Sequence, residues 1–319
     1  MRVRFGSLKK RKDLVRLAVA VALVPAMLVQ QSFAWGHDGH QMINRAAGES
    51  LPKDAPEFLR SKAALDALDF YGPIPDRQWR SNAEPELNAA ESPEHFVNLE
   101  YADLLEQPLP RRRYDFIRLL AETQAAHPEV KMTPPGVGML PYGVSEYYEK
   151  LEAAMHDYRG LLEEKADTRA VEAEIVYVAG VLGHFVADGS NPMHASIEYN
   201  GWVGPNPHGY TTDHHVHVLF ESDFVHANVK AADFTGLVPA KPVVLEDVFA
   251  DYMKYLRHSN SLVEKTYALE KAGGFTGAGT AESRAFVDER LAAGATELRD
   301  MIYTAWVKSA APVKPYVGN

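Results

Sequence analysis

The 319-residue chain contains no cysteine, which excludes a disulfide framework and a lipid anchor attached through cysteine. It also has no excess of basic charge, since 33 lysines and arginines stand against 43 aspartates and glutamates, for a formal net charge of −10. This balance argues against non-specific capture of nucleic acid along a broad basic surface. Internal repeats and low-complexity tracts are absent as well, and only one long apolar run is present. Stability must therefore come from the core and from any metal that the protein binds.

The one long apolar run occupies residues 17–29. Seven basic side chains and one acid precede it in residues 2–16, and the small residues Ser32 and Ala34 follow it at the spacing of a cleavage site. This pattern predicts that residues 1–34 are a signal peptide. The alternative is an uncleaved N-terminal anchor.

Cleavage after residue 34 would leave a strongly acidic chain that begins at Trp35. The loss of seven basic residues and one acid changes the formal net charge from −10 to −16. We expect this chain to be exported, to a periplasm or out of the cell, without a stable membrane anchor. Residues 35–319 are long enough for one large single-core domain or two small ones, and we assign them to one domain.

Apolar periodicity predicts an all-α fold. Apolar residues recur at i, i+3 and i+4 spacing, with little Gly or Pro, in residues 111–126, 144–165, 170–187, 245–271 and 282–309. Sustained apolar–polar alternation, the pattern of a half-buried strand, is absent. Proline and glycine mark four loops, at residues 71–75, 84–93, 133–143 and 189–210. Long loops on a helical scaffold often carry functional residues.

Two histidine–carboxylate pairs flank a third histidine. His184 and Asp188 are four residues apart at the end of a predicted helix, so both side chains project from one face. His217 and Glu221 repeat the spacing, and His194 lies between the pairs. A single pair of this kind is usually a salt bridge or a solvated surface pair. Histidine and carboxylate ligands suit zinc and similar first-row ions, so the repeated arrangement predicts a metal site.

Four further candidate ligands lie upstream. The free amine and the carbonyl oxygen of Trp35, once cleavage exposes it, can chelate a metal ion, and His40 is close enough to join them. His95 follows a loop where a buried histidine would need a partner; the alternative is an ordinary surface histidine. Asp76 follows Gly and Pro residues, and the alternative for it is a helix cap.

The order of these residues resembles the superfamily that joins bacterial zinc-dependent phospholipases C to single-strand-specific zinc nucleases. The residues that carry the resemblance are Trp35, His40, Asp76, His95, His184, Asp188, His194, His217 and Glu221. The closest single match is the run H-F-V-A-D-G-S-N-P-M-H, which extends from His184 to His194. The resemblance covers roughly residues 35–224 and implies the all-α fold that the periodicity predicts independently.

The resemblance implies three zinc ions. It assigns the first to Asp76, His95, His184 and Asp188. It assigns the second to the amine and carbonyl of Trp35, to His40 and to Asp188, which bridges the two ions. It assigns the third to His194, His217 and Glu221.

The implied chemistry is in-line attack on a phosphoester by zinc-bound hydroxide. Two neighbouring zinc ions lower the pKa of a shared water, and a third stabilises charge on the phosphate and leaving oxygens. Asp76 and Asp188 are the expected catalytic residues, with Asp76 also a candidate proton acceptor. Arg77 or Arg80 is a candidate to steady the phosphorus centre.

The substrate residues leave two alternatives open. Phe96 matches a position where the nucleases place an aromatic ring against a base. Asn98 stands where the nuclease pattern has an acid that reads the base edge. Asp38 falls where the phospholipases have an acid for the choline head group, but Ser92 stands where they present an aromatic ring to that cation.

We therefore expect an exported zinc-dependent phosphodiesterase, a nuclease acting on single-stranded DNA or RNA. The first alternative is a phospholipase C acting on phosphatidylcholine-type lipids, which Glu221, the run from Asn191 to His194 and the absence of disulfides favour. The second alternative is an exported helical binding protein without catalytic activity.

Overall fold

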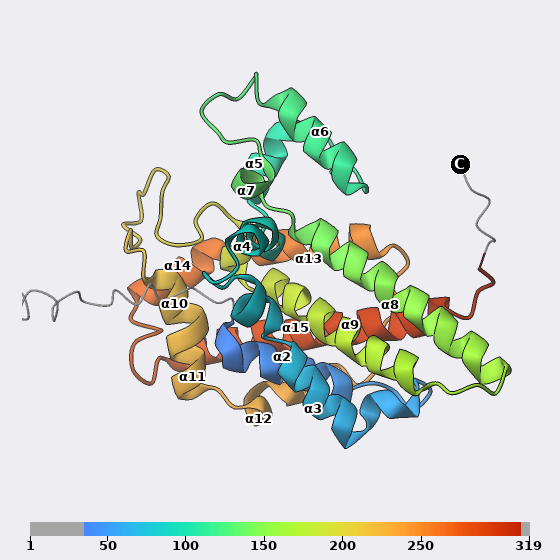
Figure 1. The fold of residues 1–319 in the computed structure, drawn as a ribbon. Coiled ribbons are helices and arrows are strands. Elements are labelled where there is room, and N and C mark those ends of the chain that lie inside the picture. The colour runs from blue at the N-terminus through green and yellow to red at the C-terminus, as the bar shows by residue number, and fades with distance from the viewer. Residues whose placement is uncertain (1–34, 314–319) are drawn as a thin grey trace, which may run out of the picture. The chain divides into compact units, whose positions relative to one another are not determined.

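The computed structural model describes residues 35–313, so the predicted signal peptide lies outside the described residues. The longer helices form the frame of the domain (Figure 1): α2 (Gly36–Glu49), α3 (Lys62–Tyr71), α6 (Arg113–Thr123), α8 (Leu140–Glu163), α9 (Arg169–Ser190), α13 (Val248–Ser261), α14 (Val263–Lys271) and α15 (Ala281–Lys308).

Short helical segments connect this frame. The short α-helices are α4 (Pro85–Glu91), α5 (Leu99–Ala102), α7 (Pro134–Val137), α10 (Val216–Val218), α11 (Phe224–Asn228) and α12 (Ala231–Phe234). The 3-10 turns are η1 (Glu57–Arg60), η3 (Ser92–His95), η4 (Asp103–Leu105), η5 (Pro192–Ala195) and η7 (Thr235–Leu237). Two π-helical turns complete the set: η2 (Pro75–Trp79) and η6 (Leu219–Asp223).

The all-α prediction is confirmed. Residues 35–313 contain no β-strand, and their β-type pairing is confined to the isolated bridges Val97–Gly138 and Tyr199–Gly201. The described residues form a single helical domain.

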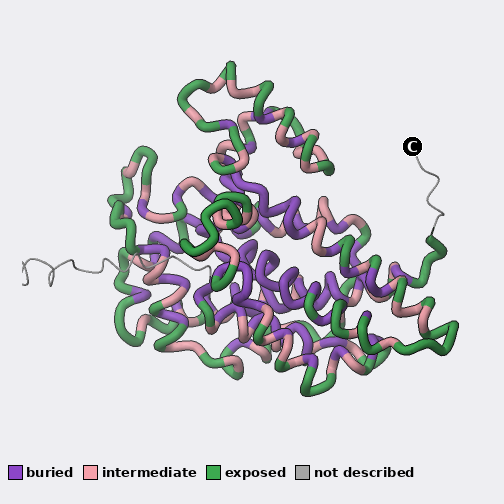
Figure 2. The backbone as a smooth tube through the Cα atoms, in the orientation of Figure 1, coloured by how far each residue is buried: buried purple, intermediate pink, exposed green. Residues whose placement is uncertain are grey.

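Helix α9 lies at the centre of the domain, with α8, α15, α3 and α2 packed around it. Every residue from 178 to 190 is buried, as Figure 2 shows along this helix. Glycines allow the close packing, because a Cβ at Gly183 would lie 2.0 Å from Asn44 Oδ1, and one at Gly180 would lie 2.5 Å from Tyr71 Cβ. His184 and Asp188 are therefore carried into the interior by the most tightly enclosed helix.

The apolar composition of α9 reflects this burial. Among the described helices, α9 alone is long and apolar enough to cross a membrane, with a mean hydropathy of 1.5 over its most apolar window. Of that window, 72% is buried inside the fold, as expected for a core helix that is apolar all round.

Two predicted loops contain helices, and these predictions are wrong. Residues 84–93 form α4 and the start of η3, while residues 133–143 form α7 and the start of α8. The prolines that suggested loops stand in the first turns of α4, α7 and α8. A missing N–H costs no hydrogen bond at the first helical positions, so proline starts these helices instead of excluding them.

Other boundaries also differ from the prediction. Residues 245–271 form two helices, α13 and α14, which meet at Leu262. Near the junction the Ser261 hydroxyl donates to the carbonyl of His258 at 2.6 Å, and such side-chain bonds compete with helix continuation. Helix α9 runs through Gly189 to Ser190. Glycine at position 189 makes room for the Tyr252 hydroxyl, which a Cβ would approach to 2.2 Å.

Apolar periodicity does not predict α2 or α3. Three glycines in α2 lower its helix propensity. Their packing explains two of them: a Cβ at Gly39 would lie 2.8 Å from Trp35 Cβ, and one at Gly48 would lie 2.7 Å from Leu65. Close tertiary contact therefore selects glycine at positions where propensity alone favours other residues.

Candidate metal centre

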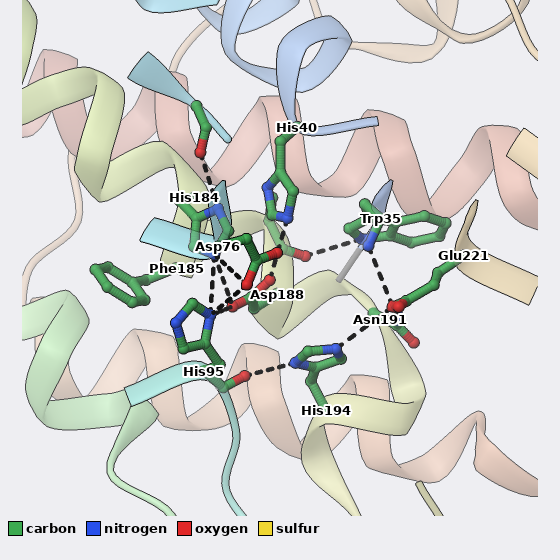
Figure 3. A network of polar contacts seen from close by, with 12 residues as sticks. Trp35, His40, Asp76, His95, His184, Phe185, Asp188, Asn191, His194 and Glu221 are labelled. Atoms are coloured by element: carbon green, nitrogen blue, oxygen red, sulfur yellow. Dashed lines mark hydrogen bonds and ion pairs between the residues drawn. The ribbon is translucent and has the colours of Figure 1, made fainter. Parts of the chain in front are cut away.

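Four buried ligand atoms converge at the C-terminal end of α9. His184 and Asp188 come from α9, His95 comes from η3, and Asp76 comes from the π-turn η2 (Figure 3). His95 Nδ1 lies 2.9 Å from His184 Nε2 and 3.1 Å from Asp188 Oδ2. Asp76 Oδ1 lies 3.5 Å from His95 Nδ1 and 3.8 Å from His184 Nε2. We call these residues the four-ligand group, and each is at most 2% exposed.

The distances that join His95 and His184 to each other and to the two carboxylates are close to those around a tetrahedral zinc ion. Zinc–ligand bonds of about 2.0–2.1 Å place neighbouring ligand atoms about 3.3–3.4 Å apart. The measured distances range from 2.9 to 3.8 Å, with 3.5 Å between His184 Nε2 and Asp188 Oδ2. His184 Nδ1 donates to the carbonyl of Gly72 at 2.8 Å, so its Nε2 presents a lone pair to the group.

Asp188 also faces a second group through its other oxygen. Asp188 Oδ1 lies 3.4 Å from His40 Nε2, while Oδ2 faces His95 and His184. The rings of His40 and His184 stack with their centroids 3.9 Å apart. We call His40, His184 and Asp188 the His40 group. One carboxylate placed between two sets of ligands is the arrangement that a bridging ligand requires.

Trp35 is fully buried beside these groups. Its indole Nε1 donates to the carbonyl of Ala187 at 2.9 Å and to Ser190 Oγ at 2.7 Å. Its backbone nitrogen lies 3.2 Å from Glu221 Oε2, and its carbonyl oxygen accepts from the Gly39 amide at 3.0 Å. Chelation by the amine that cleavage would expose stays a prediction, supported by the burial of this residue at the site.

A third group contains His194, His217 and Glu221, and we call it the His194 triad. The two Nε2 atoms lie 3.1 Å apart. Glu221 Oε2 lies 2.8 Å from His217 Nε2 and 3.5 Å from His194 Nε2. Asn191 Nδ2 donates to the same oxygen at 3.0 Å, which holds the carboxylate toward the histidines.

The His194 triad needs a cation between its nitrogens. His194 Nδ1 donates to the carbonyl of His95 at 2.5 Å, and His217 Nδ1 donates to the carbonyl of Tyr199 at 2.6 Å. In neutral imidazoles both Nε2 atoms then carry lone pairs, and two lone pairs 3.1 Å apart repel each other. A proton or a metal ion must lie between them, and the fixed Nδ1 protons are the arrangement found for metal-binding histidines.

Burial perturbs every titratable member of the four-ligand group. Burial raises the pKa of Asp76 to about 7 although Arg80 opposes the shift, and burial together with Asp76 raises the pKa of Asp188 well above its ordinary value. Burial lowers the pKa of His95 and of His184 well below the ordinary value. Asp76 Oδ2 is buried without a hydrogen-bond partner among residues 35–313. A divalent cation would supply the positive charge that these carboxylates lack.

Together the structure brings eight of the nine predicted ligand residues into three buried groups that could hold metal ions. The ligand atoms lie within 4.8 Å of one another in three triads: Asp76–His95–His184, His40–His184–Asp188 and His194–His217–Glu221. The grouped residues are His40, Asp76, His95, His184, Asp188, His194, His217 and Glu221. Trp35 adjoins them through its contact with Glu221.

Both carboxylates that come from outside α9 occupy π-helical turns. Asp76 lies in η2 and Glu221 lies in η6, which interrupts the helical run 216–228. A π-turn inserts one residue into a helix, widens it locally and is frequent at functional sites. The i, i+4 spacing of His217 and Glu221 is visible in the sequence, whereas the π-turn that carries Glu221 is not.

The sequence analysis did not predict several groups that orient the ligand side chains. Asn191 holds Glu221 and accepts from the Met193 amide at 2.9 Å as the cap of η5. The Asn-Pro dipeptide is a turn signal that could have pointed to this cap. The carbonyls of Gly72, His95 and Tyr199 orient ligand histidines, and any residue type can supply a carbonyl, so no sequence signal marks them.

A cavity of about 590 Å³ opens beside the metal groups. Its lining includes Arg80 and the predicted ligands His95, His194 and His217. The rest of the lining is largely apolar or uncharged and includes Phe96, Asn98, Tyr101, Tyr199 and Val203. Ligand side chains and an apolar wall therefore share one hollow, the usual form of a small-molecule or substrate site.

Two of the predicted substrate residues, Phe96 and Asn98, line this cavity. Phe96 is partly exposed and Asn98 is 7% exposed. Asn98 Nδ2 donates to the carbonyl of Gly136 at 2.9 Å, which fixes the amide orientation. Its buried Oδ1 has no hydrogen-bond partner among the described residues, so this side chain has an unused acceptor.

The two candidate arginines differ in position. Arg80 lines the cavity and donates to Asp76 Oδ1 at 3.0 Å. The Arg77 guanidinium lies 4.6 Å from the centre of the Phe70 ring, and Arg77 lines a separate hollow of about 90 Å³ together with Asp76. Only Arg80 is therefore placed to meet a group in the large cavity.

Asp38 does not line the large cavity. Its side chain is 42% exposed, and Asp38 Oδ2 lies 2.6 Å from His226 Nδ1. The structure therefore separates Asp38 from Phe96 and Asn98.

No family model, curated protein or solved structure matches this chain. The geometry of the three groups and the cavity therefore carries the functional argument.

Proposed function

We propose that this protein is an exported zinc-dependent phosphodiesterase that hydrolyses P–O ester bonds in single-stranded nucleic acid. The observation that carries the proposal is the convergence of three buried histidine–carboxylate groups beside one cavity of about 590 Å³. Such donor sets suit zinc, and buried carboxylates with raised pKa values need a compensating cation. When bound, zinc ions would lower the pKa of a water and polarise phosphate oxygens.

The protein's own residues supply positioning, charge and proton transfer. Asp188 presents one oxygen to the four-ligand group and one to His40, so it can hold two ions at a fixed separation. Asp76 is the candidate proton acceptor, because its buried Oδ2 has no hydrogen-bond partner among residues 35–313 and is left to accept a proton. Arg80 faces the cavity from beside Asp76, where its guanidinium can donate to a phosphate oxygen.

The cavity wall supports a nucleic acid substrate. Phe96 offers an aromatic ring to a base, and stacking of this kind suits an unpaired strand. Asn98 also lines this wall, and its amide is held by the carbonyl of Gly136. Among residues 35–313, Arg80 is the one arginine or lysine that lines the cavity, and it can meet a single phosphate group.

Phospholipase C remains the second candidate because of the cavity rim. Tyr199 and Val203 line the cavity and are 53% and 60% exposed, which would suit contact with lipid chains. The position of Asp38 weighs against a choline site at the cavity, since Asp38 pairs with His226 away from it.

The deciding experiment is a product assay on zinc-loaded protein that begins at Trp35. Single-stranded DNA, single-stranded RNA and phosphatidylcholine vesicles are incubated in parallel, each with and without a chelator. Chelator-sensitive release of nucleotides supports the proposal, and release of phosphocholine alone replaces it with the phospholipase reading. Stoichiometric zinc binding without turnover of any substrate would instead favour a binding protein.

The matched control is Asp188→Asn, which keeps the shape of the side chain and removes its charge. In the proposed enzyme this variant loses zinc and activity together. Full zinc content and full activity in Asp188→Asn would contradict the bridging role of this residue.

A further inference from the structure

Arg113 joins three separate elements of the fold. It is the first residue of α6, and its guanidinium contacts Glu94 in η3 and Glu146 in α8. Nε and Nη2 donate to Glu146 at 2.6 and 2.9 Å. Nη2 also donates to Glu94 Oε2 at 3.0 Å, and Nη1 donates to Glu94 Oε1. One planar guanidinium therefore holds both carboxylates in a bidentate manner.

Glu94 directly precedes His95, which serves two metal groups at once. The His95 side chain belongs to the four-ligand group, where Nδ1 lies 3.1 Å from Asp188 Oδ2. The His95 carbonyl accepts from His194 Nδ1 at 2.5 Å and so fixes the ring of a ligand in the His194 triad. A shift of η3 would therefore disturb two groups.

Helix α8 fits closely around this contact. A Cβ at Gly143 would lie 2.8 Å from Glu94 Oε2, so a side chain at this position would have to displace the clamped carboxylate. The Glu94 side chain is 12% exposed and cannot swing freely into solvent without releasing Arg113.

We infer that Arg113 is a positioning residue for the metal centre: it clamps Glu94 to Glu146 and thereby fixes η3, which carries His95. The inference rests on the proposed function in so far as His95 binds metal. Because the clamp holds two carboxylates with a single cation, loss of Arg113 would leave Glu94 and Glu146 in mutual repulsion.

The rest of η3 is held by backbone bonds that do not depend on Arg113. The Met139 amide donates to the Pro93 carbonyl at 2.7 Å, and the Val97 amide donates to the His194 carbonyl at 2.9 Å. Variants at Arg113 should therefore fold, with a displaced η3 as their main defect.

The test compares Arg113→Gln with Arg118→Gln, a control that removes an arginine from the exposed face of the same helix. Metal-free protein that begins at Trp35 is titrated with Co²⁺ and followed by visible absorption. The expected result is that Arg113→Gln raises the dissociation constant of at least one ion about tenfold, the effect of losing an outer support of a metal ligand. Arg113→Lys should fall between Arg113→Gln and wild type, because a lysine cannot form the forked contact.

Gly143→Ala provides a second, independent perturbation of Glu94. It should weaken Co²⁺ binding in the same direction, and its effect should shrink in the Arg113→Gln background, where Glu94 is already released. Equal effects of Gly143→Ala in both backgrounds would overturn the clamp, and so would Co²⁺ affinities of Arg113→Gln within twofold of wild type.

A measurement without metal separates this inference from the proposed function. In ¹⁵N-histidine-labelled, metal-free protein, the His194 Nδ1 proton reports the hydrogen bond to the His95 carbonyl. The inference expects this signal to shift or exchange faster in Arg113→Gln and to stay unchanged in Arg118→Gln. If wild-type protein binds no metal, the proposed function fails, while an unchanged His194 signal in Arg113→Gln overturns the clamp by itself.

Discussion

The four-ligand group and the His194 triad have similar residue types and similar burial, but the pKa values of their carboxyl groups shift in opposite directions. In the four-ligand group, burial raises the pKa of Asp76 to about 7 and lowers the pKa of His95, so both residues favour their neutral forms. In the His194 triad, burial opposes ionisation but the histidines outweigh it, and the pKa of Glu221 falls to about 2. Glu221 in turn raises the pKa of His217 against the effect of burial.

The difference comes from the pairing of each carboxylate. Glu221 meets two histidines and a donor from Asn191, so its charge is compensated within the triad. Asp76 and Asp188 share two histidines, and Asp76 adds to the effect of burial in raising the pKa of Asp188. The triad can therefore hold a proton where a metal would lie, whereas Arg80 compensates the four-ligand group only in part, and this group has the greater need for metal.

The largest expected effect follows from the shared position of Asp188. Asp188→Asn should remove the affinity for two ions, because its carboxylate faces both the four-ligand group and the His40 group. Glu221→Gln should weaken only the ion of the His194 triad. Zinc content per chain, measured by elemental analysis after dialysis, checks this difference. Equal losses in the two variants would contradict the bridging role.

A second effect concerns the stability of the metal-free protein and has opposite signs in the two groups. Glu221 has a folded pKa of about 2, below its ordinary 4.5, so it stabilises the fold above pH 4.5 and loses this contribution as pH falls toward 2. Asp76 has a folded pKa of about 7, above its ordinary 3.8, so its ionisation costs stability once pH rises past 3.8, and the full cost is reached above pH 7.

At pH 8 without metal, Glu221→Gln should therefore lower the free energy of unfolding and Asp76→Asn should raise it. The change is up to about 3 kcal/mol for Glu221→Gln and about 4 kcal/mol for Asp76→Asn, since one pKa unit corresponds to about 1.4 kcal/mol. Urea unfolding in the presence of a chelator measures both. Saturating zinc should reverse the sign for Asp76→Asn, because the ionised carboxylate then binds the metal. A destabilised metal-free Asp76→Asn would show that Asp76 is compensated in some other way.

Side-chain spacing within a helix could be predicted from the sequence, whereas local backbone geometry at the site could not. The pairs His184–Asp188 and His217–Glu221 are visible because i, i+4 spacing places two side chains on one helix face. The sequence does not show the π-turns that carry Asp76 and Glu221, since these turns depend on local helix geometry. The carbonyls of Gly72, His95 and Tyr199 are also invisible, because they come from the backbone.

The fold was predictable to a similar extent. Strongly apolar periodicity predicts α8, α9 and α15, whose burial matches their pattern. Helix α2 was not predicted, because Gly39 and Gly48 lower its helix propensity. Close contacts with Trp35 and Leu65 account for glycine at these two positions. The short helices that begin at proline were not predicted, because proline is also typical of loops. In both cases tertiary contact or position within the helix outweighs the local preference of the residue.

A smaller effect is expected at the cavity wall. Phe96→Ala should raise KM for a single-stranded oligonucleotide about tenfold and change kcat less, since base stacking contributes about 1–3 kcal/mol. Asn98→Ala should change KM less than Phe96→Ala, because Asn98 Oδ1 is buried and its amide nitrogen bonds to Gly136. Steady-state kinetics with homopolymeric oligonucleotides measures both. An unchanged KM in Phe96→Ala would remove the support that this ring gives to a nucleic acid substrate.

The smallest effect is expected at Asp38. A variant at this residue tests whether substrate binds at the exposed surface around Asp38 or in the large cavity. Asp38 is 42% exposed and pairs with His226, an exposed contact of a kind that contributes little to stability. Asp38→Asn should leave zinc content and nucleotide release within about twofold of wild type. If Asp38→Asn instead abolished hydrolysis of phosphatidylcholine, Asp38 would have to reach the substrate from outside the large cavity. The substrate would then bind across the α2 surface, and the phospholipase reading would replace the nuclease proposal.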